Sequence, residues 1–213
     1  MKIKKIIALV ALYMGFLQFS AFAQVNLEDM TFAQMIRSVD LSKEPKAADL
    51  IKKYQELEAR QKLMNGPLSP KQGDCNIELY RKKEVILITI PASYLFAPNS
   101  TELSDRAAKY LKPIMRYMKD PDMFRVLFVM HTDNTGSLQY RDNITADRVD
   151  AVAAWFDDQG ADTSYTFSYA FGDEAPLVPN TSIENRNKNR RLEVFLMPGT
   201  KMLEEAKKGK IDF

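Results

Sequence analysis

The chain has 213 residues, of which 46% are hydrophobic, enough for one main domain with a buried core and a smaller appendage. Its formal net charge is +2, but three of its 30 basic residues and none of its acidic residues lie in the first 23 positions. The other 27 basic residues face 28 acidic ones, so the rest of the chain is nearly neutral. This balance gives no argument for nucleic-acid binding.

Residues 1–23 have the pattern of a secretory signal peptide. A basic start leads into an apolar run over residues 6–19, and the small residues Ala21 and Ala23 precede a predicted cleavage site before Gln24. An uncleaved membrane anchor is the less favoured alternative, because the apolar stretch is only slightly shorter than a membrane span. No cysteine follows the run directly, which argues against lipid attachment at a lipoprotein-type site. We therefore expect an exported, periplasmic protein.

One cysteine, Cys75, and one histidine, His131, restrict the redox and metal chemistry of this chain. A single cysteine cannot form an intrachain disulfide, so the protein is not a disulfide scaffold. An interchain bond and a partly buried free thiol both remain open, and the thiol is favoured. The spacing of potential ligands does not match a zinc site. We expect no metal and no other cofactor.

Residues 24–75 are predicted to form a helical segment and a linker. One apolar stripe follows the helical spacing i, i+3, i+4 and i+7, over Phe32, Met35, Ile36 and Val39. A second stripe, after an expected N-cap at Ser42 and Pro45 in the first turn, contains Leu50, Ile51, Tyr54 and Leu57. Asn65-Gly66-Pro67 ends this helix and gives a boundary near residue 75. The stripes predict packing on the following domain or on a second chain, including a homodimer.

Residues 76–198 alternate between predicted strands and helices. Strands are expected at 76–81, 84–90, 124–130, 165–170 and 192–197, and helices at 101–119, with a kink or break at Pro113, and from an N-cap at Thr145 to Gln159. This order predicts a two-layer α/β (α+β) sandwich with helices on one face of a mixed sheet. Residues 172–190 are expected to be a polar loop. The charged tail 199–213 is predicted to be a loosely held helix.

The polar stretch His131–Arg148 follows a predicted buried strand, a position where rigid scaffolds commonly present binding groups. Asp133 lies just past the strand, and Arg148 is predicted in the first turn of the next helix, on the same face as Val152. An inward-facing arginine needs an anionic partner. The pair is therefore either an internal salt bridge or a zwitterion pocket. In a pocket, Asp133 would bind an ammonium group and Arg148 a carboxylate.

Four sequence blocks of this region resemble the OmpA-like peptidoglycan-binding domain family, which includes Pal and MotB. They occur in order over about residues 76–198, as Phe96–Leu103, His131–Gly136, Tyr140–Arg148 and Asn189–Val194. The resemblance implies a βαβαββ fold and non-covalent binding of peptidoglycan through the zwitterionic end of diaminopimelate in its stem peptide. It also implies association with the cell wall or the outer membrane, where the protein would anchor an envelope component.

By position in these blocks, Asp133 matches the ammonium-binding aspartate of the family, Arg148 its carboxylate-binding arginine and Thr132 a neighbouring polar contact. The predicted ligand-binding set is Asp133, Arg148, Thr132, Arg141, Asn99 and Arg186. Arg141 stands where the family usually has asparagine, so a second cation either strengthens the carboxylate contact or crowds it. Met130 and Ala97 also depart from the family pattern, from glycine and aspartate respectively.

Two other functions remain open. The domain could be an interaction subunit of an envelope complex that keeps the fold and does not bind the wall. A hydrolase would need His131, Asp133 and Ser137 to act together, but no nucleophile elbow surrounds Ser137. We therefore do not expect an enzyme. The arginines at 186, 190 and 191 lie among acidic residues and are expected to form a solvated, paired surface.

Overall fold

The computed structural model describes residues 29–39 and 41–211, which belong to two compact units, Met1–Val39 and Asp40–Phe213. The predicted signal peptide, residues 1–23, lies outside the described residues. In the first unit, helix α1 (Phe32–Arg37) begins at a capping box in which Thr31 and Gln34 satisfy each other's backbone N–H groups. The packing partner predicted for its apolar stripe stays a prediction.

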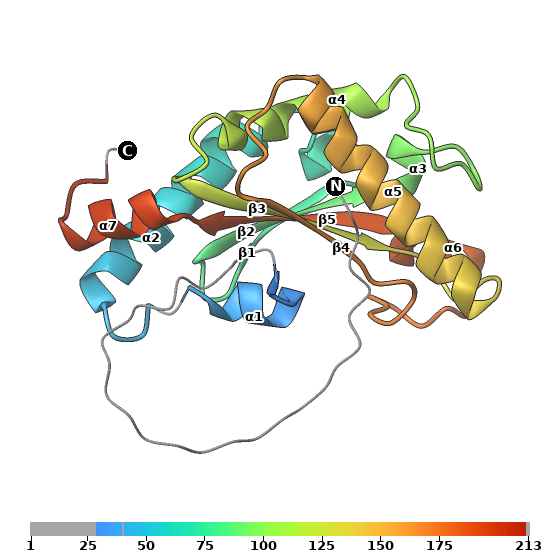
Figure 1. Ribbon diagram of the computed structural model, residues 1–213, viewed down its shortest axis with the longest axis horizontal. Helices are drawn as coiled ribbons and strands as arrows, with labels where there is room; N and C mark the ends of the chain where they lie inside the picture. The colour runs from blue at the N-terminus through green and yellow to red at the C-terminus, as the bar shows by residue number, and fades with distance from the viewer. Residues whose placement is uncertain (1–28, 40, 212–213) are drawn as a thin grey trace, which may run out of the picture. The chain divides into compact units, whose positions relative to one another are not determined.

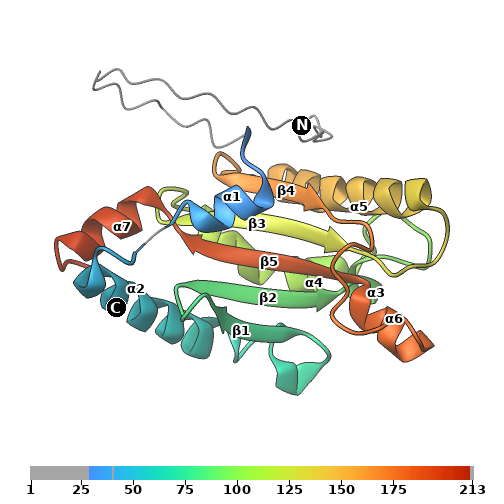
Figure 2. The same cartoon turned by 90° about the horizontal axis from the view of Figure 1, so that it is seen from below.

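The second unit is built on a five-stranded sheet with the order β1-β2-β5-β3-β4 (Figures 1 and 2). Only β3 and β4 are paired in parallel; the other neighbours in this sheet are antiparallel. The strands are β1 (Asn76–Tyr80), β2 (Val85–Pro91), β3 (Phe124–His131), β4 (Thr166–Ala170) and β5 (Arg191–Pro198). The predicted mixed sheet of an α/β fold is confirmed.

Helices α4 and α5 cover one face of this sheet (Figure 1). Phe128 of β3 stacks on Phe156 of α5 with ring centroids 5.1 Å apart, and both side chains are fully buried. The helical segments of the second unit are α2 (Pro45–Glu58), the π-helix η2 (Ala59–Leu63), the 3-10 turn η3 (Pro70–Gln72), α3 (Ala92–Leu95), α4 (Ala107–Leu111), the 3-10 helix η4 (Lys112–Met118), α5 (Leu138–Asp158), α6 (Ile183–Asn189) and α7 (Thr200–Lys207). None of the helices in residues 29–39 and 41–211 has the length and apolar character needed to cross a membrane.

The predicted helix 101–119 is shorter than expected and is split. Its first residues are not helical, because Leu103 forms a β-bridge with Phe96 and the Ser104 N–H donates to the Leu95 carbonyl. The α-helical part then changes to the 3-10 helix η4 at Lys112, next to Pro113, as the predicted break required.

Helix α5 begins eight residues earlier than the sequence predicted. Its N-cap is Ser137, whose hydroxyl accepts the Tyr140 N–H at 3.2 Å. Thr145, the predicted cap, lies inside the helix, where its hydroxyl donates to the Arg141 carbonyl at 2.9 Å and accepts the Gly172 N–H at 3.2 Å. Arg148 therefore lies in the middle of a long helix and not in a first turn.

Two further segments differ from expectation. The predicted loop 172–190 contains α6, which is capped by the Ser182 hydroxyl through the Asn185 N–H at 3.0 Å. The C-terminal helix α7 is held against α2 and buries Met202 and Ala206, so it is not a loose tail. Both α6 and α7 are short, and caps and tertiary contacts stabilise such helices more than their intrinsic propensity does.

Helix α2 packs on β2 and α7, which confirms for this helix the predicted packing on the domain. It begins after Glu44, without a side-chain cap, and not at Ser42. Its Tyr54 ring lies 6.2 Å from that of Phe124, the first residue of β3. Figure 2 shows α2 and α7 together at the end of the sheet opposite α3 and α6. Residues 40–75 thus belong to the same compact unit as the sheet.

Gln55 links α2 to the sheet through two hydrogen bonds, one partly buried and one buried. Its side-chain amide donates to the Glu84 carbonyl at 3.2 Å and to the Leu196 carbonyl at 3.3 Å. We expect Gln55→Ala to lower the free energy of unfolding by about 1–3 kcal/mol, because one buried and one partly buried hydrogen bond to carbonyls are lost. Urea unfolding would measure this loss. The exposed Gln61→Ala is the matched control, and equal effects of the two changes would contradict the role of Gln55.

Candidate ligand-binding site

Asp133 lies directly after β3 and is 1% exposed. Its Oδ1 accepts the Thr135 N–H at 2.7 Å, and its Oδ2 accepts a hydrogen bond from the Arg190 guanidinium. Burial alone would raise the pKa of Asp133, but the hydrogen bonds from Thr135 and the charge of Arg190 outweigh burial and lower it. Asp133 is therefore a buried carboxylate that is ionised at neutral pH.

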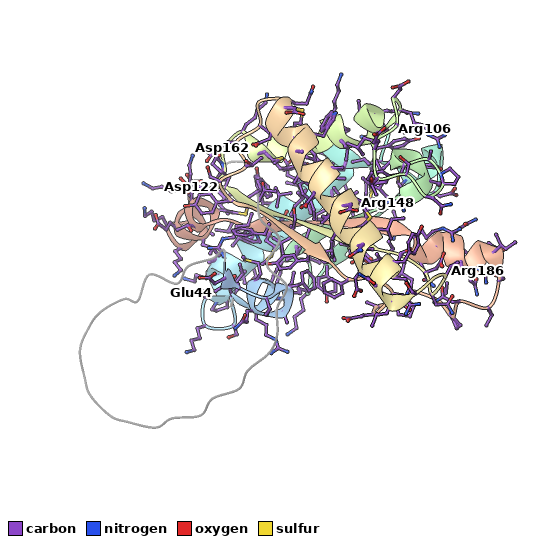
Figure 3. All side chains as sticks on the ribbon, turned by 45° about the vertical axis from the view of Figure 1, so that its right-hand side comes forward. Glu44, Arg106, Asp122, Arg148, Asp162 and Arg186 are labelled. Atoms are coloured by element: carbon purple, nitrogen blue, oxygen red, sulfur yellow. The ribbon has the colours of Figure 1, made fainter. Side chains whose placement is uncertain are left out.

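Arg148 is a buried cation on the inner side of α5, 5% exposed (Figure 3). Its Nε donates to the Ser100 carbonyl at 2.8 Å, and its Nη2 donates to the Ala97 carbonyl at 3.4 Å. The guanidinium carbon lies 4.8 Å from the centre of the Phe96 ring, a cation–π contact. Within residues 29–39 and 41–211, Arg148 forms no ion pair. Burial lowers its pKa, but arginine remains charged near neutrality.

Asp133 and Arg148 do not form a salt bridge with each other, which was one of the two arrangements predicted from the sequence. The cation on Asp133 is Arg190, the residue that joins α6 to β5. Arg190 is close enough to Arg148 for its charge to lower the pKa of Arg148. The predicted ligand-binding set omitted Arg190. The available signal was its position in the fourth sequence block.

Arg141 stabilises the loop between β3 and α5 through hydrogen bonds. Its Nε donates to Asp173 at 2.7 Å, and its Nη1 donates to the Gly136 carbonyl at 2.7 Å. The backbone N–H of Thr132 similarly joins this loop to the Gly172 carbonyl at 2.8 Å. These contacts hold the loop that carries Asp133 against the segment after β4. Ligand contacts of Arg141 and Thr132 remain predictions.

Asn99 and Tyr140 form a hydrogen bond beside Arg148, with the Tyr140 hydroxyl donating to Asn99 Oδ1 at 3.1 Å. Asn99 has a φ of 57°, in the left-handed region that asparagine tolerates better than most residues. A Cβ atom on Gly136, at a φ of 86°, would lie 2.7 Å from the Tyr140 ring, so this turn requires glycine. Arg186 lies out on α6 (Figure 3) and donates to the Asn180 carbonyl at 3.2 Å. Its role as a ligand contact stays a prediction.

His131 belongs to a separate buried cluster with Glu193 and Arg191 on adjacent strands. Its Nε2 lies 3.3 Å from Glu193 Oε2, and Glu193 Oε1 accepts a hydrogen bond from Arg191 Nε at 2.7 Å. The Ser137 hydroxyl serves as the α5 cap, and Asp133 is bound to Arg190. The three side chains that a hydrolase would need to combine thus have different partners. In the part of the chain that the structure describes, no three metal-ligating side chains form a cluster suited to a metal ion.

The buried imidazole of His131 predicts a loss of stability as the pH falls. Burial lowers the pKa of His131 from its ordinary 6.5, and the charge of Arg191 lowers it further against the opposing effect of Glu193. Below about pH 6.5 the unfolded chain therefore binds a proton that the folded chain does not, and stability falls by at most about 1.4 kcal/mol per pH unit. We expect a smaller fall in His131→Gln, measured by urea unfolding between pH 7.5 and 5. Parallel profiles would contradict this role.

The region that contains this site is similar in sequence to known proteins. Residues 95–190 match the sequence profile of the OmpA family. The probable lipoprotein YiaD of Escherichia coli (strain K12) is 26% identical over 131 residues, which are 62% of this chain and 60% of that protein. This chain therefore aligns with about three fifths of the length of that curated relative.

Two solved structures share the fold. The crystal structure of a MotB-like protein from Desulfovibrio vulgaris superposes with a TM-score of 0.61 at 25% identity, over 71% of this chain and 98% of that chain. The cell wall anchor of the type VI secretion system (T6SS) from Pseudomonas aeruginosa gives a TM-score of 0.56 at 23% identity, over 66% of this chain and 96% of that chain.

Proposed function

Because residues 95–190 form a domain of the OmpA family, we propose that the protein binds peptidoglycan non-covalently through the zwitterionic end of diaminopimelate. The carrying observation is Arg148, a buried guanidinium bonded only to carbonyl oxygens and an aromatic ring in the described contacts. A buried cation without an anionic partner is costly, and a ligand carboxylate would remove that cost. Asp133 supplies the opposite charge for the ligand's ammonium group.

The chemistry of the two side chains fits an amino-acid centre. A guanidinium binds a carboxylate through two parallel hydrogen bonds, which fixes the orientation of the ligand as well as its charge. An ionised carboxylate, in turn, binds an ammonium group. Both protein charges are fixed on the scaffold before binding, Arg148 by α5 and Asp133 by the loop after β3, so little ordering is needed when the ligand arrives.

The comparisons support an envelope role. One relative is named a probable lipoprotein, and one solved structure is named a cell wall anchor. We propose that this protein is exported to the periplasm and ties an envelope component to the wall, in association with the wall or the outer membrane. The partner would be an envelope protein or a second copy of this chain, bound through the N-terminal helical segment.

Co-sedimentation of the purified mature protein with isolated sacculi tests this function. We expect the wild type to sediment with sacculi and to be released by soluble muropeptides that carry free diaminopimelate ends. Muropeptide release from the sacculi, followed in the same samples, would reveal hydrolysis. A folded wild type that stays in the supernatant would overturn wall binding and favour the interaction subunit.

A further inference from the structure

The Asp133 carboxylate is buried and already paired. Its side chain is 2% exposed, and each of its oxygens already accepts a hydrogen bond, one from Thr135 and one from Arg190. An ammonium group that approached this carboxylate would meet the Arg190 guanidinium first. With Arg190 in place, the ammonium would face a neutralised carboxylate beside two arginines, which is unfavourable.

We infer that Arg190 is an exchangeable counterion: the ligand's ammonium group replaces it on Asp133, and Arg190 turns to the ligand's carboxylate beside Arg148. This inference rests on the proposed function and names the residue that prepares the site. In this structure Arg190 neutralises Asp133 and Arg148 has no described anionic partner; with a zwitterion bound, Asp133 would pair with the ammonium group and both arginines with the carboxylate. Arg190 is thus a ligand-binding residue and not a fixed structural bridge.

The geometry of Arg190 allows this exchange. Its backbone is fixed, because its N–H donates to the Arg186 carbonyl at 3.0 Å and its own carbonyl accepts the Ala92 N–H at 2.9 Å. Its side chain is 35% exposed, in contrast to Asp133. Its second partner, Asn187 on α6, is uncharged. A long side chain on a fixed backbone can change partner by rotamer changes alone.

The charges of the neighbouring groups favour a carboxylate between the two arginines. Burial is the main cause of the lowered pKa of Arg148, and the charge of Arg190 lowers it further, so the two guanidinium groups lie within electrostatic reach of each other. The third arginine, Arg141, is already paired with Asp173. Asp133, Arg148 and Arg190 together carry one excess positive charge. A ligand with an ammonium group alone would add to this excess, whereas a zwitterion brings the carboxylate that the released Arg190 needs.

The test compares two probes on the full mature protein by isothermal titration calorimetry. One is a stem peptide with a free zwitterionic diaminopimelate end, and the other is the same peptide with that end's carboxylate amidated. We expect the wild type to prefer the free peptide at least tenfold. In Arg190→Ala the amidated peptide should bind more tightly than it does to wild type, because its ammonium no longer competes with a guanidinium. The preference should shrink at least threefold.

Three further variants complete the design. Arg190→Gln removes the charge and keeps a hydrogen-bond donor, so it replaces the alanine variant if that one does not fold. Arg190→Lys keeps the cation and should retain the wild-type preference. Lys188→Ala, on the adjoining helix α6 and paired with Glu184, is the control. An unchanged preference in folded Arg190→Ala or Arg190→Gln would overturn the exchange alone. Failure of the wild type to bind either probe would overturn the proposed function, and the exchange with it.

Discussion

Arg148→Ala is expected to abolish co-sedimentation with sacculi and to leave the domain folded. The ligand carboxylate would lose its bidentate partner in a partly desolvated site, a loss of about 2–5 kcal/mol, or at least tenfold in affinity. Arg148→Lys should also bind poorly, because an ammonium is a point charge and cannot reproduce the guanidinium fork. The melting temperature should fall only moderately, because the Ser100 and Ala97 carbonyls lose their donor while the cost of a buried cation with no described ion pair disappears.

The same reasoning predicts that Asp133→Ala loses binding, but with a different effect on stability. Removing Asp133 takes the counterion from Arg190, so this variant should be less stable than Arg148→Ala. Arg106→Ala is a suitable control, because Arg106 is an exposed arginine that donates to the Ser93 carbonyl. Wild-type sacculus affinity in a folded Asp133→Ala or Arg148→Ala variant would rule out the zwitterion pocket.

Glu193→Ala is expected to lower the free energy of unfolding by about 3–5 kcal/mol, because it leaves the buried Arg191 without its counterion. Burial alone would raise the pKa of Glu193, but the imidazole of His131 at 3.3 Å and the charge of Arg191 lower it below its ordinary 4.5. The stabilisation from Glu193 is therefore present above about pH 4.5 and is lost as the pH falls through the lower, folded-state pKa.

Urea unfolding at pH 7 and at pH 3 would measure this contribution. At pH 7 the urea concentration at the unfolding midpoint should be far lower for Glu193→Ala than for wild type. The difference between the two midpoints should be smaller at pH 3. Glu78→Ala, which removes an exposed glutamate from a strand of the same sheet, is the control. A loss under 1 kcal/mol for Glu193→Ala would show that the Arg191 contacts to the Asn189 and Ala175 carbonyls suffice.

The strands were predictable because their signal is local. β2 and β3 contain continuous apolar runs, over residues 85–88 and 126–130, which is the pattern of strands buried on both faces. The helix starts were less predictable. Ser137 and Thr145 are both acceptable caps by residue type, but the Thr145 hydroxyl lies inside the helix and accepts the Gly172 N–H from 27 residues away. A contact of that range leaves no mark in the local pattern.

The site was predictable in composition but not in pairing. Position in the sequence blocks selected Asp133 and Arg148, and both are buried at the end of β3 and on the inner face of α5. Asp133, however, pairs with Arg190, 57 residues further along the chain, because β5 returns to lie beside β3. The spacing of charges in the sequence gives no information on that pairing. Helix α6, which positions Arg190, was also not predicted, because its sequence is rich in polar residues and shows no apolar stripe.

The placement of α2 and α7 has a mechanical consequence for a tether. They lie at the end of the sheet where β3 begins, whereas Asp133 follows its last residue, so the two regions are at opposite ends of the strands (Figure 2). A pull between the wall and α2 would run along the strands. The hydrogen bonds between antiparallel strands are perpendicular to that direction. Tension would therefore load all the hydrogen bonds between two strands in shear at once and would not break them one after another. A sheet pulled from opposite ends of its strands therefore resists extension as a unit.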